Sequence, residues 1–362
     1  MEQKRLGDIA TYINGYAFKP EDRGSTGLPS IRIQDLTGNA YDLGFYDGKY
    51  PEKIEINDGD VLISWSASLG VYIWNRGKGL LNQHIFKVVF DKCEVNKQYF
   101  VFAVKYKLKE MELKTHGATM KHIVKKDFDN TVIPFPTVEK QADIAYILSK
   151  IESIVEFRKQ ELQQLDDLIK ARFVEMFGDM YLNSKGWPEA KLESMADVVS
   201  GITKGRKTKA EDLTEVPYMA VSNVKDGYID WTTVKTIEAT QQEIEQYRLL
   251  ADDVLMTEGG DPDKVGRGAI IKEPLENCIH QNHIFRVRLD ESMILPEFFA
   301  EYLQHQRSKR YFLGCAKQTT GIASINMTQL RALPVLMPPL SKQEEFVLFK
   351  AQVNKSKLKK LR

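Results

Sequence analysis

One long segment, residues 139–177, organises the sequence and reads EKQADIAYILSKIESIVEFRKQELQQLDDLIKARFVEMF. Its seam residues recur at alternating intervals of four and three, which is typical of a helix packed along a partner helix. They are Ile144, Leu148, Ile151, Val155, Arg158, Leu162, Leu165, Ile169, Arg172 and Met176. Neither Gly nor Pro interrupts the segment before Gly178. At about 1.5 Å per residue, this helix is roughly 60 Å long, too long for one small domain to bury.

Two arginines, Arg158 and Arg172, occupy seam positions that are otherwise apolar. A cation buried in a dry seam without a partner is strongly destabilising. We therefore expect both side chains to face carboxylates or water.

The length, charge and cysteine content of the chain limit the possible classes of protein only broadly. A chain of 362 residues is long enough for about two domains, each with its own core. The 51 Lys and Arg residues nearly balance the 50 Asp and Glu residues, so any basic surface must be local. Cys93, Cys278 and Cys315 lie far apart without CxxC spacing, which favours a reducing cytoplasm and argues against disulfides or a thiolate zinc site.

The ends and the hydropathy indicate no export signal and no membrane span. The chain begins with a mixed, charged segment, and no apolar run approaches the ~18 residues needed to cross a bilayer. We therefore expect a cytoplasmic protein that does not enter a membrane.

Both sides of the long segment mix short strands with turns. In the first part, apolar runs predict strands at 31–33, 61–65, 71–74 and 85–90, and residues 99–113 predict a helix. Glycines separate the runs. The pattern indicates an α+β fold with twisted sheets.

The same landmarks then return in the same order. The pairs are Gly15 and Gly201, Pro29 and Pro217, Asp60 and Asp253, His84 and His283, Ile123 and Ile325, Pro136 and Pro338, and Gln141 and Gln343. Their offset grows steadily from 186 to 202, as expected if loops lengthened after a tandem duplication. From Ser341 the start of the helix repeats as well, with an apolar stripe at Phe346, Phe349 and Val353. Because the domain is duplicated and the loop sequences of the two copies differ, we predict two unequal binding surfaces.

Several segments resemble catalytic motifs, but each departs from the pattern that the chemistry requires. Residues 201–208 resemble a phosphate loop, but Arg206 separates the glycine from the lysine and the spacing is short. His280 and His283 start a strand, where they fall on opposite faces and are poor metal partners. Asp261 and Asp263 lie in a glycine-rich turn. No adenine methyltransferase loop is present. A DNA-processing enzyme with its own catalytic site is therefore the weaker alternative.

Polar and basic loops are the better candidates for function. A basic loop holds Thr203, Lys204, Arg206, Lys207 and Lys209, whereas its first counterpart, residues 15–19, offers Lys19. A second pair of segments lies just before the landmark isoleucines and holds Thr119, Lys121 and His122 in one copy and Lys317, Gln318, Thr319, Thr320, Ser324 and Asn326 in the other. Such side chains suit phosphate and base-edge contacts on DNA. A solvated loop is the plain alternative for any one of them.

Several runs, taken in order, resemble the specificity subunit of a type I restriction-modification system. They are Leu6-Gly7-Asp8-Ile9-Ala10, the Asp-Val-Leu strands, Gln83-His84-Ile85-Phe86, Pro136 before Gln141, residues 172–179 and residues 257–268. The resemblance covers nearly the whole chain. It implies a target-recognition domain at 1–137, a spacer helix at 138–178, a linker and second target-recognition domain at 179–338, and a second helix at 339–362.

The resemblance also implies a role. Such a subunit has no catalytic site, binds no cofactor itself, and reads a bipartite site in double-stranded DNA. Two methyltransferase subunits with S-adenosylmethionine bind to its antiparallel helices, and a restriction subunit with ATP and Mg²⁺ joins where one is present. Further contact candidates are Arg32, Gln34, Asn223, Lys225, Lys264 and Arg267. An interaction scaffold whose domains bind protein is the remaining alternative.

One departure from the family concerns the helices. The first helical segment has 39 residues and the second, from Ser341 to Arg362, has 22. Antiparallel pairing then covers about half of the long helix. We expect the rest of its apolar stripe to dock a methyltransferase subunit or a second copy, unless the chain is truncated.

Overall fold

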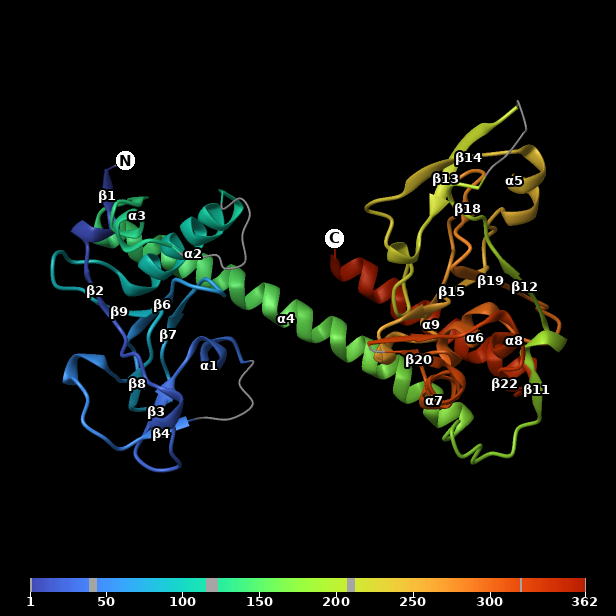
Figure 1. Ribbon diagram of the computed structural model, residues 1–362, viewed down its shortest axis with the longest axis horizontal. Coiled ribbons are helices and arrows are strands. Elements are labelled where there is room, and N and C mark those ends of the chain that lie inside the picture. Colours follow the sequence, from blue (N-terminus) through green and yellow to red (C-terminus); the bar gives the residue numbers. More distant parts are fainter. Residues whose placement is uncertain (1, 39–43, 115–122, 207–211, 320, 362) are drawn as a thin grey trace. The chain divides into compact units, whose positions relative to one another are not determined.

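The computed structural model describes residues 2–38, 44–114, 123–206, 212–319 and 321–361 (Figure 1). The chain forms two compact units, unit 1 at Met1–Phe157 and unit 2 at Arg158–Arg362. Helix α4, Val138–Phe177, starts in unit 1 and ends in unit 2. It matches the helix predicted at residues 139–177 to within one residue.

Unit 1 is built on two four-stranded sheets and a two-stranded ribbon. The first sheet has the order β2 (Thr11–Asn14), β9 (Ile85–Val89), β6 (Val61–Ser64) and β7 (Gly70–Ile73). The second has the order β4 (Gly44–Tyr46), β3 (Leu28–Ile31), β8 (Gly79–Leu81) and β5 (Glu55–Ile56). The ribbon pairs β1 (Gln3–Arg5) with β10 (Val132–Pro134), and the helices are α1 (Ile33–Thr37), α2 (Lys97–Lys114), α3 (Lys125–Asp129) and the start of α4.

Unit 2 repeats the strand order of the main sheet and the ribbon, and differs in its smaller sheets. Its main sheet has the order β12 (Ala196–Ser200), β19 (Ile284–Leu289), β15 (Val254–Thr257) and β17 (Gly268–Ile270). A second sheet orders β14 (Lys235–Ala239), β13 (Thr214–Met219) and β18 (Ile279–His280), and a ribbon pairs β11 (Glu189–Lys191) with β22 (Pro334–Leu336). A small third sheet orders β16 (Gly259–Gly260), β21 (Ile322–Ser324) and β20 (Lys317–Thr319). The helices are the end of α4 with α5 (Gln241–Tyr247), α6 (Pro296–Tyr302), α7 (Gln306–Cys315), α8 (Met327–Arg331) and α9 (Leu340–Leu361).

The central strands explain why the repeated Asp-Val-Leu runs are apolar throughout. In β6, Val61 and Ile63 belong to one hydrophobic core of unit 1, and Leu62 belongs to the other. Because successive side chains of a strand point to opposite faces, a strand between two cores needs apolar residues at every position. In β15 the same division places Val254 in one core of unit 2 and Leu255 in another.

The same glutamine fixes the start of the helix in both copies. The Gln141 side chain accepts from the backbone N–H of Asn96 at 2.9 Å and donates to the carbonyl of Pro136 at 2.8 Å. Gln343 accepts from Leu295 N–H at 2.9 Å and donates to the Pro338 carbonyl at 2.8 Å. Both glutamines are fully buried. The duplication predicted from the sequence therefore extends to individual hydrogen bonds.

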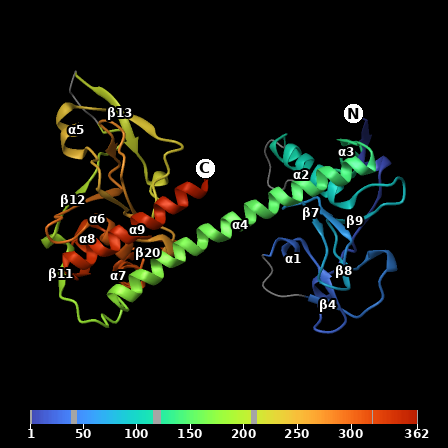
Figure 2. The same ribbon diagram turned by 180° about the vertical axis from the view of Figure 1, so that it is seen from behind.

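Within unit 2, the end of α4 packs antiparallel along α9 (Figure 2). Arg172 pairs with Glu345 at 2.7 Å, and Asp166 pairs with Lys357 at 2.5 Å, so residue numbers fall along one helix as they rise along the other. The predicted packing residues Leu165, Ile169, Phe346, Phe349 and Val353 all belong to this core or pack against it, whereas Leu162 is half-buried.

The predicted surroundings of the two seam arginines are confirmed. Arg158 pairs with Glu161 at 2.7 Å, and Arg172 pairs with Glu175 at 2.9 Å in addition to Glu345. Both are charge-assisted hydrogen bonds at a solvated edge.

One predicted strand is wrong. The expected strand at 31–33 ends at Ile31, and α1 begins at Ile33. The Asp35 carboxylate accepts from the backbone N–H of Arg32 at 2.8 Å, which satisfies a donor at the helix start and turns the chain. The other predicted strands of unit 1 agree with β6, β7 and β9, and the predicted helix agrees with α2. Among the helices of the described residues, none combines the length and apolarity needed to cross a bilayer.

Candidate nucleic-acid interface

Four chain segments meet at one edge of each unit, and one glycine in each unit, Gly15 or Gly201, allows the closest of these approaches. A Cβ on Gly15 would lie 2.0 Å from the Asn82 carbonyl oxygen, and one on Gly201 would lie 1.9 Å from that of His280. Since no side chain tolerates such an approach, glycine is required at both positions. The loop that follows β2 or β12 is thereby held against the turn after β8 or β18.

These turns, residues 82–84 in unit 1 and 281–283 in unit 2, make matching backbone bonds. Gln83 N–H donates to the Tyr16 carbonyl at 2.8 Å, and Asn282 N–H donates to that of Ile202 at 3.0 Å. Trp65 N–H donates to the His84 carbonyl at 3.1 Å, and Glu258 N–H donates to that of His283 at 3.0 Å. We call residues 82–84 and 281–283 the strand-end turns.

The segments of the landmark isoleucines join the same edges. Ile123 N–H donates to the Trp65 carbonyl at 2.9 Å, and Ile325 N–H donates to the Glu258 carbonyl at 2.8 Å. The basic loop after Gly201 and the polar segment before Ile325, which the sequence analysis singled out separately, therefore flank one turn. The backbone hydrogen bonds around the two strand-end turns match, whereas the side chains around them differ.

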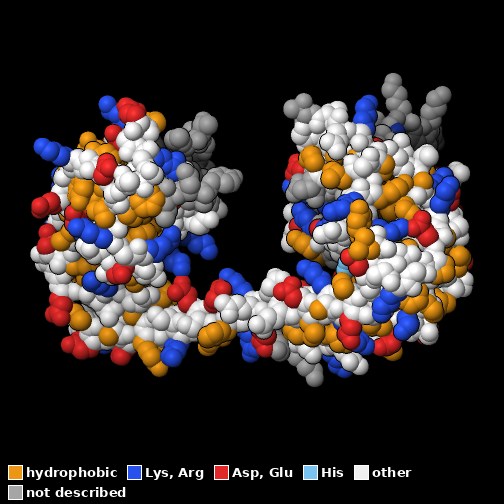
Figure 3. Space-filling view, turned by 90° about the horizontal axis from the view of Figure 1, so that it is seen from below, with side chains coloured by type: hydrophobic (Ala, Val, Ile, Leu, Met, Phe, Trp, Pro, Cys, Tyr) orange, Lys and Arg blue, Asp and Glu red, His pale blue; other side chains and the backbone are white. Residues whose placement is uncertain are grey.

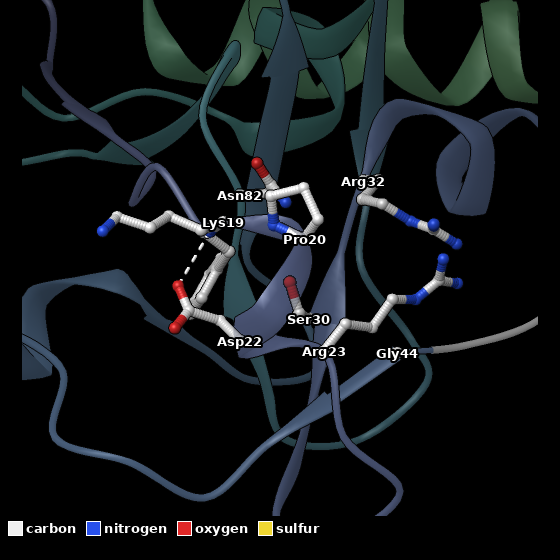
Figure 4. A pocket seen from close by; sticks show the side chains of 9 residues that line it. Lys19, Pro20, Asp22, Arg23, Ser30, Arg32, Gly44 and Asn82 are labelled. Atoms are coloured by element: carbon white, nitrogen blue, oxygen red, sulfur yellow. Dashed lines mark hydrogen bonds between the residues drawn. The ribbon is translucent and has the colours of Figure 1, made fainter.

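In unit 1, a cavity of about 340 Å³ lies beside the strand-end turn (Figure 4). Its lining combines the predicted residues Lys19 and Arg32 with Arg23, Ser30 and Asn82. Figure 4 shows the guanidinium groups of Arg23 and Arg32 pointing to the same side, away from Lys19. Asp22 is tied to the backbone N–H of Lys19 at 2.8 Å. Three cations with an amide and a hydroxyl suit a nucleotide's phosphate and base edge.

In unit 2, the third sheet brings together residues that are far apart in the sequence. Gly259 pairs with Ser324, and Lys317 pairs with Ser324 from the other side. Lys317, Gln318 and Thr319 are exposed along β20. The nearby turn carries Lys264, which pairs with Asp261, and half-buried Arg267. The pairing of β16, β21 and β20 thus places Lys317, Gln318 and Thr319 in the same small sheet as the strand that leads into the turn with Lys264 and Arg267.

The aromatic and charged neighbours of the two turn histidines differ. The ring of His84 lies 4.9 Å from that of Trp65, whose indole N–H donates to the Asn14 side chain at 3.3 Å. His283 instead contacts the Glu258 carboxylate through Nδ1 at 2.5 Å. An aromatic pair in one unit and an acid with an imidazole in the other present different hydrogen-bonding groups on the same frame.

Two predicted contact residues have structural roles instead. Asn223 is buried, and its side chain accepts from Ala220 N–H and donates to the carbonyls of Asp230 and Thr233, so it cannot reach a base. The Arg206 guanidinium binds the Glu243 carboxylate at 2.6 Å and holds that carboxyl's pKa at about 2. Both residues show that a polar side chain predicted to contact DNA can also stabilise its own unit.

The remaining predicted residues are placed as follows. Gln34, Thr203 and Lys204 are exposed, Lys225 is half-buried with its amine 3.9 Å from Asp230, and Asn326 caps α8 by accepting from Gln329 N–H at 2.9 Å. Thr119, Lys121, His122, Lys207, Lys209 and Thr320 lie outside the described residues.

His280 ends β18 and His283 lies in the strand-end turn, so the predicted common strand is wrong although the two rings do have different environments. His280 is buried, and burial lowers its pKa to about 3, so its ring is neutral and holds the Ile284 carbonyl at 3.0 Å. Within the described part of the chain, no three His, Cys, Asp or Glu side chains gather as metal ligands would.

Arg23, Ser30, Asn82, Gln281 and Asn282 were missed by the sequence analysis. The strand-end turns hold His84 and His283, which were landmarks of the repeat. Polar residues repeated next to a buried strand could therefore have pointed to Asn82, Gln281 and Asn282. Arg23 and Ser30 gave no such signal, because only the fold places them next to Asn82.

Two copies of one mixed domain, each joined to a helix and each presenting different polar groups, define a two-site recognition protein. The family model described as "Type I restriction modification DNA specificity domain" matches residues 1–167 and 184–360, and the chain belongs to this family.

Relatives and solved structures agree. The chain is 22% identical to the type I restriction enzyme EcoBI specificity subunit of Escherichia coli, over 94% of this chain and 77% of that protein. It is 24% identical to the EcoKI specificity subunit of Escherichia coli strain K12, over 94% and 79%. The crystal structure of the S subunit from M. genitalium aligns with 99% of this chain and 90% of its own, with a TM-score of 0.55 and 14% identity, and shows the same fold.

Proposed function

We propose that this chain is the DNA-reading subunit of a type I restriction-modification system, in which each unit reads one half of a bipartite site in double-stranded DNA. The observation that carries the proposal is the repeated strand-end turn, around which the neighbouring segments of the two units place unlike polar and basic side chains. Two equal surfaces would read a symmetric site, whereas these differ and suit an asymmetric one.

In unit 1, Arg23 and Arg32 are the candidates for reading guanine or holding phosphate, and Asn82 is the candidate for reading adenine. In unit 2, Lys204, Lys317 and Gln318 take the corresponding roles. Lys19, Lys264 and Arg267 act mainly as phosphate contacts at the rims.

The chain itself has no catalytic role in this proposal. Two methyltransferase subunits bind to its helices and supply S-adenosylmethionine, and a restriction subunit with ATP and Mg²⁺ joins where the system has one. The proposed binding of other subunits is supported by the family membership and by the exposed apolar side chains on α4. The complex would act on DNA in the cytoplasm.

The test measures duplex binding by the purified chain as a function of salt. Each lost phosphate contact should lower the slope of log K against log salt by about 0.9. We expect such a loss for Arg23→Ala with Arg32→Ala in unit 1, and for Lys204→Ala with Lys317→Ala in unit 2. Lys150→Ala with Lys159→Ala, at two exposed residues of α4, is the matched charge control.

Arg32→Ala removes the Nε contact to the buried Asp35 carboxylate at 3.2 Å but keeps the bond from the Arg32 backbone N–H at 2.8 Å, so circular dichroism should accompany each binding curve to show that the variants are folded. Equal slopes for all variants would refute the assignment of these surfaces. Labelled S-adenosylmethionine in the same mixtures provides a second readout, because methyl transfer by the chain without other subunits would refute the non-catalytic role. Methylome sequencing of cells with the intact system then supplies both half-sites.

A further inference from the structure

One position of the repeat lies between the strand-end turn and the segment of the landmark isoleucine in each unit. It is Trp65 in unit 1 and Glu258 in unit 2, each the residue directly after the central strand β6 or β15. Its N–H donates to the carbonyl of the turn histidine, and its carbonyl accepts from the N–H of the isoleucine. These distances are 3.1 and 2.9 Å in unit 1 and 3.0 and 2.8 Å in unit 2. Both backbone groups are therefore fixed, and the side chain starts from a defined point.

The side chains at this position differ in chemistry, yet each contacts the histidine of its own turn. The Trp65 ring lies 4.9 Å from that of His84 and stacks on Phe86 at 5.6 Å. The Glu258 carboxylate lies 2.5 Å from Nδ1 of His283. One position with matching backbone contacts thus carries an apolar indole in unit 1 and an acid in unit 2.

His283 orients the acid without covering it. A carboxylate only accepts hydrogen bonds, so Nδ1 of His283 carries the proton and donates to Oε2 of Glu258. The Asn282 amide nitrogen lies 3.5 Å from Nε2, the second ring nitrogen, which accepts when the ring is neutral. The side chains of Glu258 and His283 are 35% and 56% exposed. Oε1 of Glu258 can therefore accept a further hydrogen bond from a ligand.

The sign of a charge does not by itself mark a contact with DNA on this molecule. Figure 3 shows Lys and Arg side chains mixed with Asp and Glu side chains on the face in view. The neighbouring acid Asp261 pairs with the cation Lys264. Glu258 differs from it, because its printed partner is an imidazole. The role of this acid has to follow from what a carboxylate can bind at that place.

A carboxylate at a DNA surface needs a hydrogen-bond donor, because phosphates repel it. In the major groove the donors are the N4 amino group of cytosine and the N6 amino group of adenine. Adenine also presents the acceptor N7 beside N6, and this acceptor opposes a carboxylate. Cytosine is therefore the base that suits an acid at this position.

We propose that Glu258 reads a cytosine in the half-site of unit 2 by accepting a hydrogen bond from the N4 amino group, and that His283 is the positioning residue that orients the carboxylate. The inference rests on the proposed function, because it names one base that unit 2 reads. At the corresponding position of unit 1, the indole of Trp65 offers an apolar face that suits the methyl group of a thymine. This one position thus helps to make the two half-sites unlike.

The experiment lets the full chain select duplexes from a pool of random sequence, and the bound duplexes are sequenced. Glu258→Gln keeps the size of the side chain but supplies an amide, which matches N6 and N7 of adenine. We expect the preference at one base pair of one half-site to move from cytosine to adenine by at least about fivefold. The other half-site should be unchanged.

His283 is tested by the loss and return of its donor. His283→Ala should weaken the preference for cytosine at the same base pair and leave the salt dependence of binding unchanged, because no phosphate contact is lost. His283→Asn supplies a short donor again and should restore the preference. A merely structural histidine would instead change the affinity for all sequences alike.

Glu291→Gln is the matched control. Glu291 is an exposed acid just beyond the far end of β19, a six-residue strand that begins at the strand-end turn. Six residues of strand span about 20 Å, so this variant should select the same sequences as the unmodified chain. Circular dichroism of each variant shows that it is folded, and the result for His283→Ala decides the matter if Glu258→Gln is not.

The outcomes separate this inference from the proposed function. If the unmodified chain selects a bipartite sequence and neither Glu258→Gln nor His283→Ala alters it, the pair is structural and only this inference is overturned. A change at a base pair where the unmodified chain does not select cytosine would overturn the assigned base. If the unmodified chain selects no sequence, the proposed function is refuted and the inference with it.

Discussion

Removing one aromatic ring should destabilise the packing of α4 and α9 against the globular part of unit 2. Phe173 is fully buried, with ring centroids of Phe177, His305, Phe298 and Phe346 at 4.2 to 5.5 Å. Replacing it with alanine removes these contacts and leaves a cavity between α4, α6 and α9. Buried Phe→Ala changes cost about 3–5 kcal/mol.

Calorimetry or denaturant unfolding of the full chain measures this loss. For a unit of about 200 residues, each kcal/mol lowers Tm by about 2–4 °C, so the transition of unit 2 should fall by about 10 °C. Val174→Ala is the control, because the neighbouring side chain is 47% exposed and should change stability by less than about 1 kcal/mol. A Phe173→Ala loss as small as that of Val174→Ala would refute the reasoning that this ring anchors the helix pair.

Two further predictions concern the loop near Gly201 and the length of α4. Because Arg206 lowers the pKa of Glu243 from 4.5 to about 2, the pair stabilises the fold fully above pH 4.5 and loses this effect as pH falls towards 2. The free energy of unfolding should fall by about 1–2 kcal/mol between pH 6 and pH 3 because of this pair. The Glu243→Gln variant should lack this part of the pH dependence. Inserting one heptad between Ile151 and Ile169 lengthens the continuous helix by about 10 Å, or about three base pairs. If α4 sets the distance between the two half-sites, methylome sequencing should then show a spacer about three base pairs longer, and an unchanged spacer would contradict this role of the helix.

Features with a strong period or a repeat could be predicted from the sequence. The long helix differs from its prediction by one residue, and the repeated landmarks correspond to shared hydrogen bonds such as those of Gln141 and Gln343. The spacing of the apolar residues predicts the long helix because packing against a partner helix requires apolar residues at the same face in every turn. The strand at 31–33 failed because a local bond from Asp35 ends the strand, and hydrophobicity carries no trace of that bond.

The candidate site was harder to predict because its members come from four segments. Sequence reasoning chose residue types suited to DNA, but Asn223 and Arg206 use the same chemistry to hold their own loops. Arg23 and Asn82 were overlooked because the cavity that unites them exists only after β3, β4 and β8 pair. Loop geometry, which decides whether a polar group faces inward or outward, has no periodic signature.

The buried glutamines at the starts of α4 and α9 bear on how new specificities arise. Each joins a helix to its globular domain through main-chain atoms and thus places little demand on which side chains the domain carries. A gene exchange that replaces the coding region between these junctions would keep both joints intact. These two joints therefore do not depend on the polar side chains of the reading surfaces, which can change without disturbing how the starts of the helices are held.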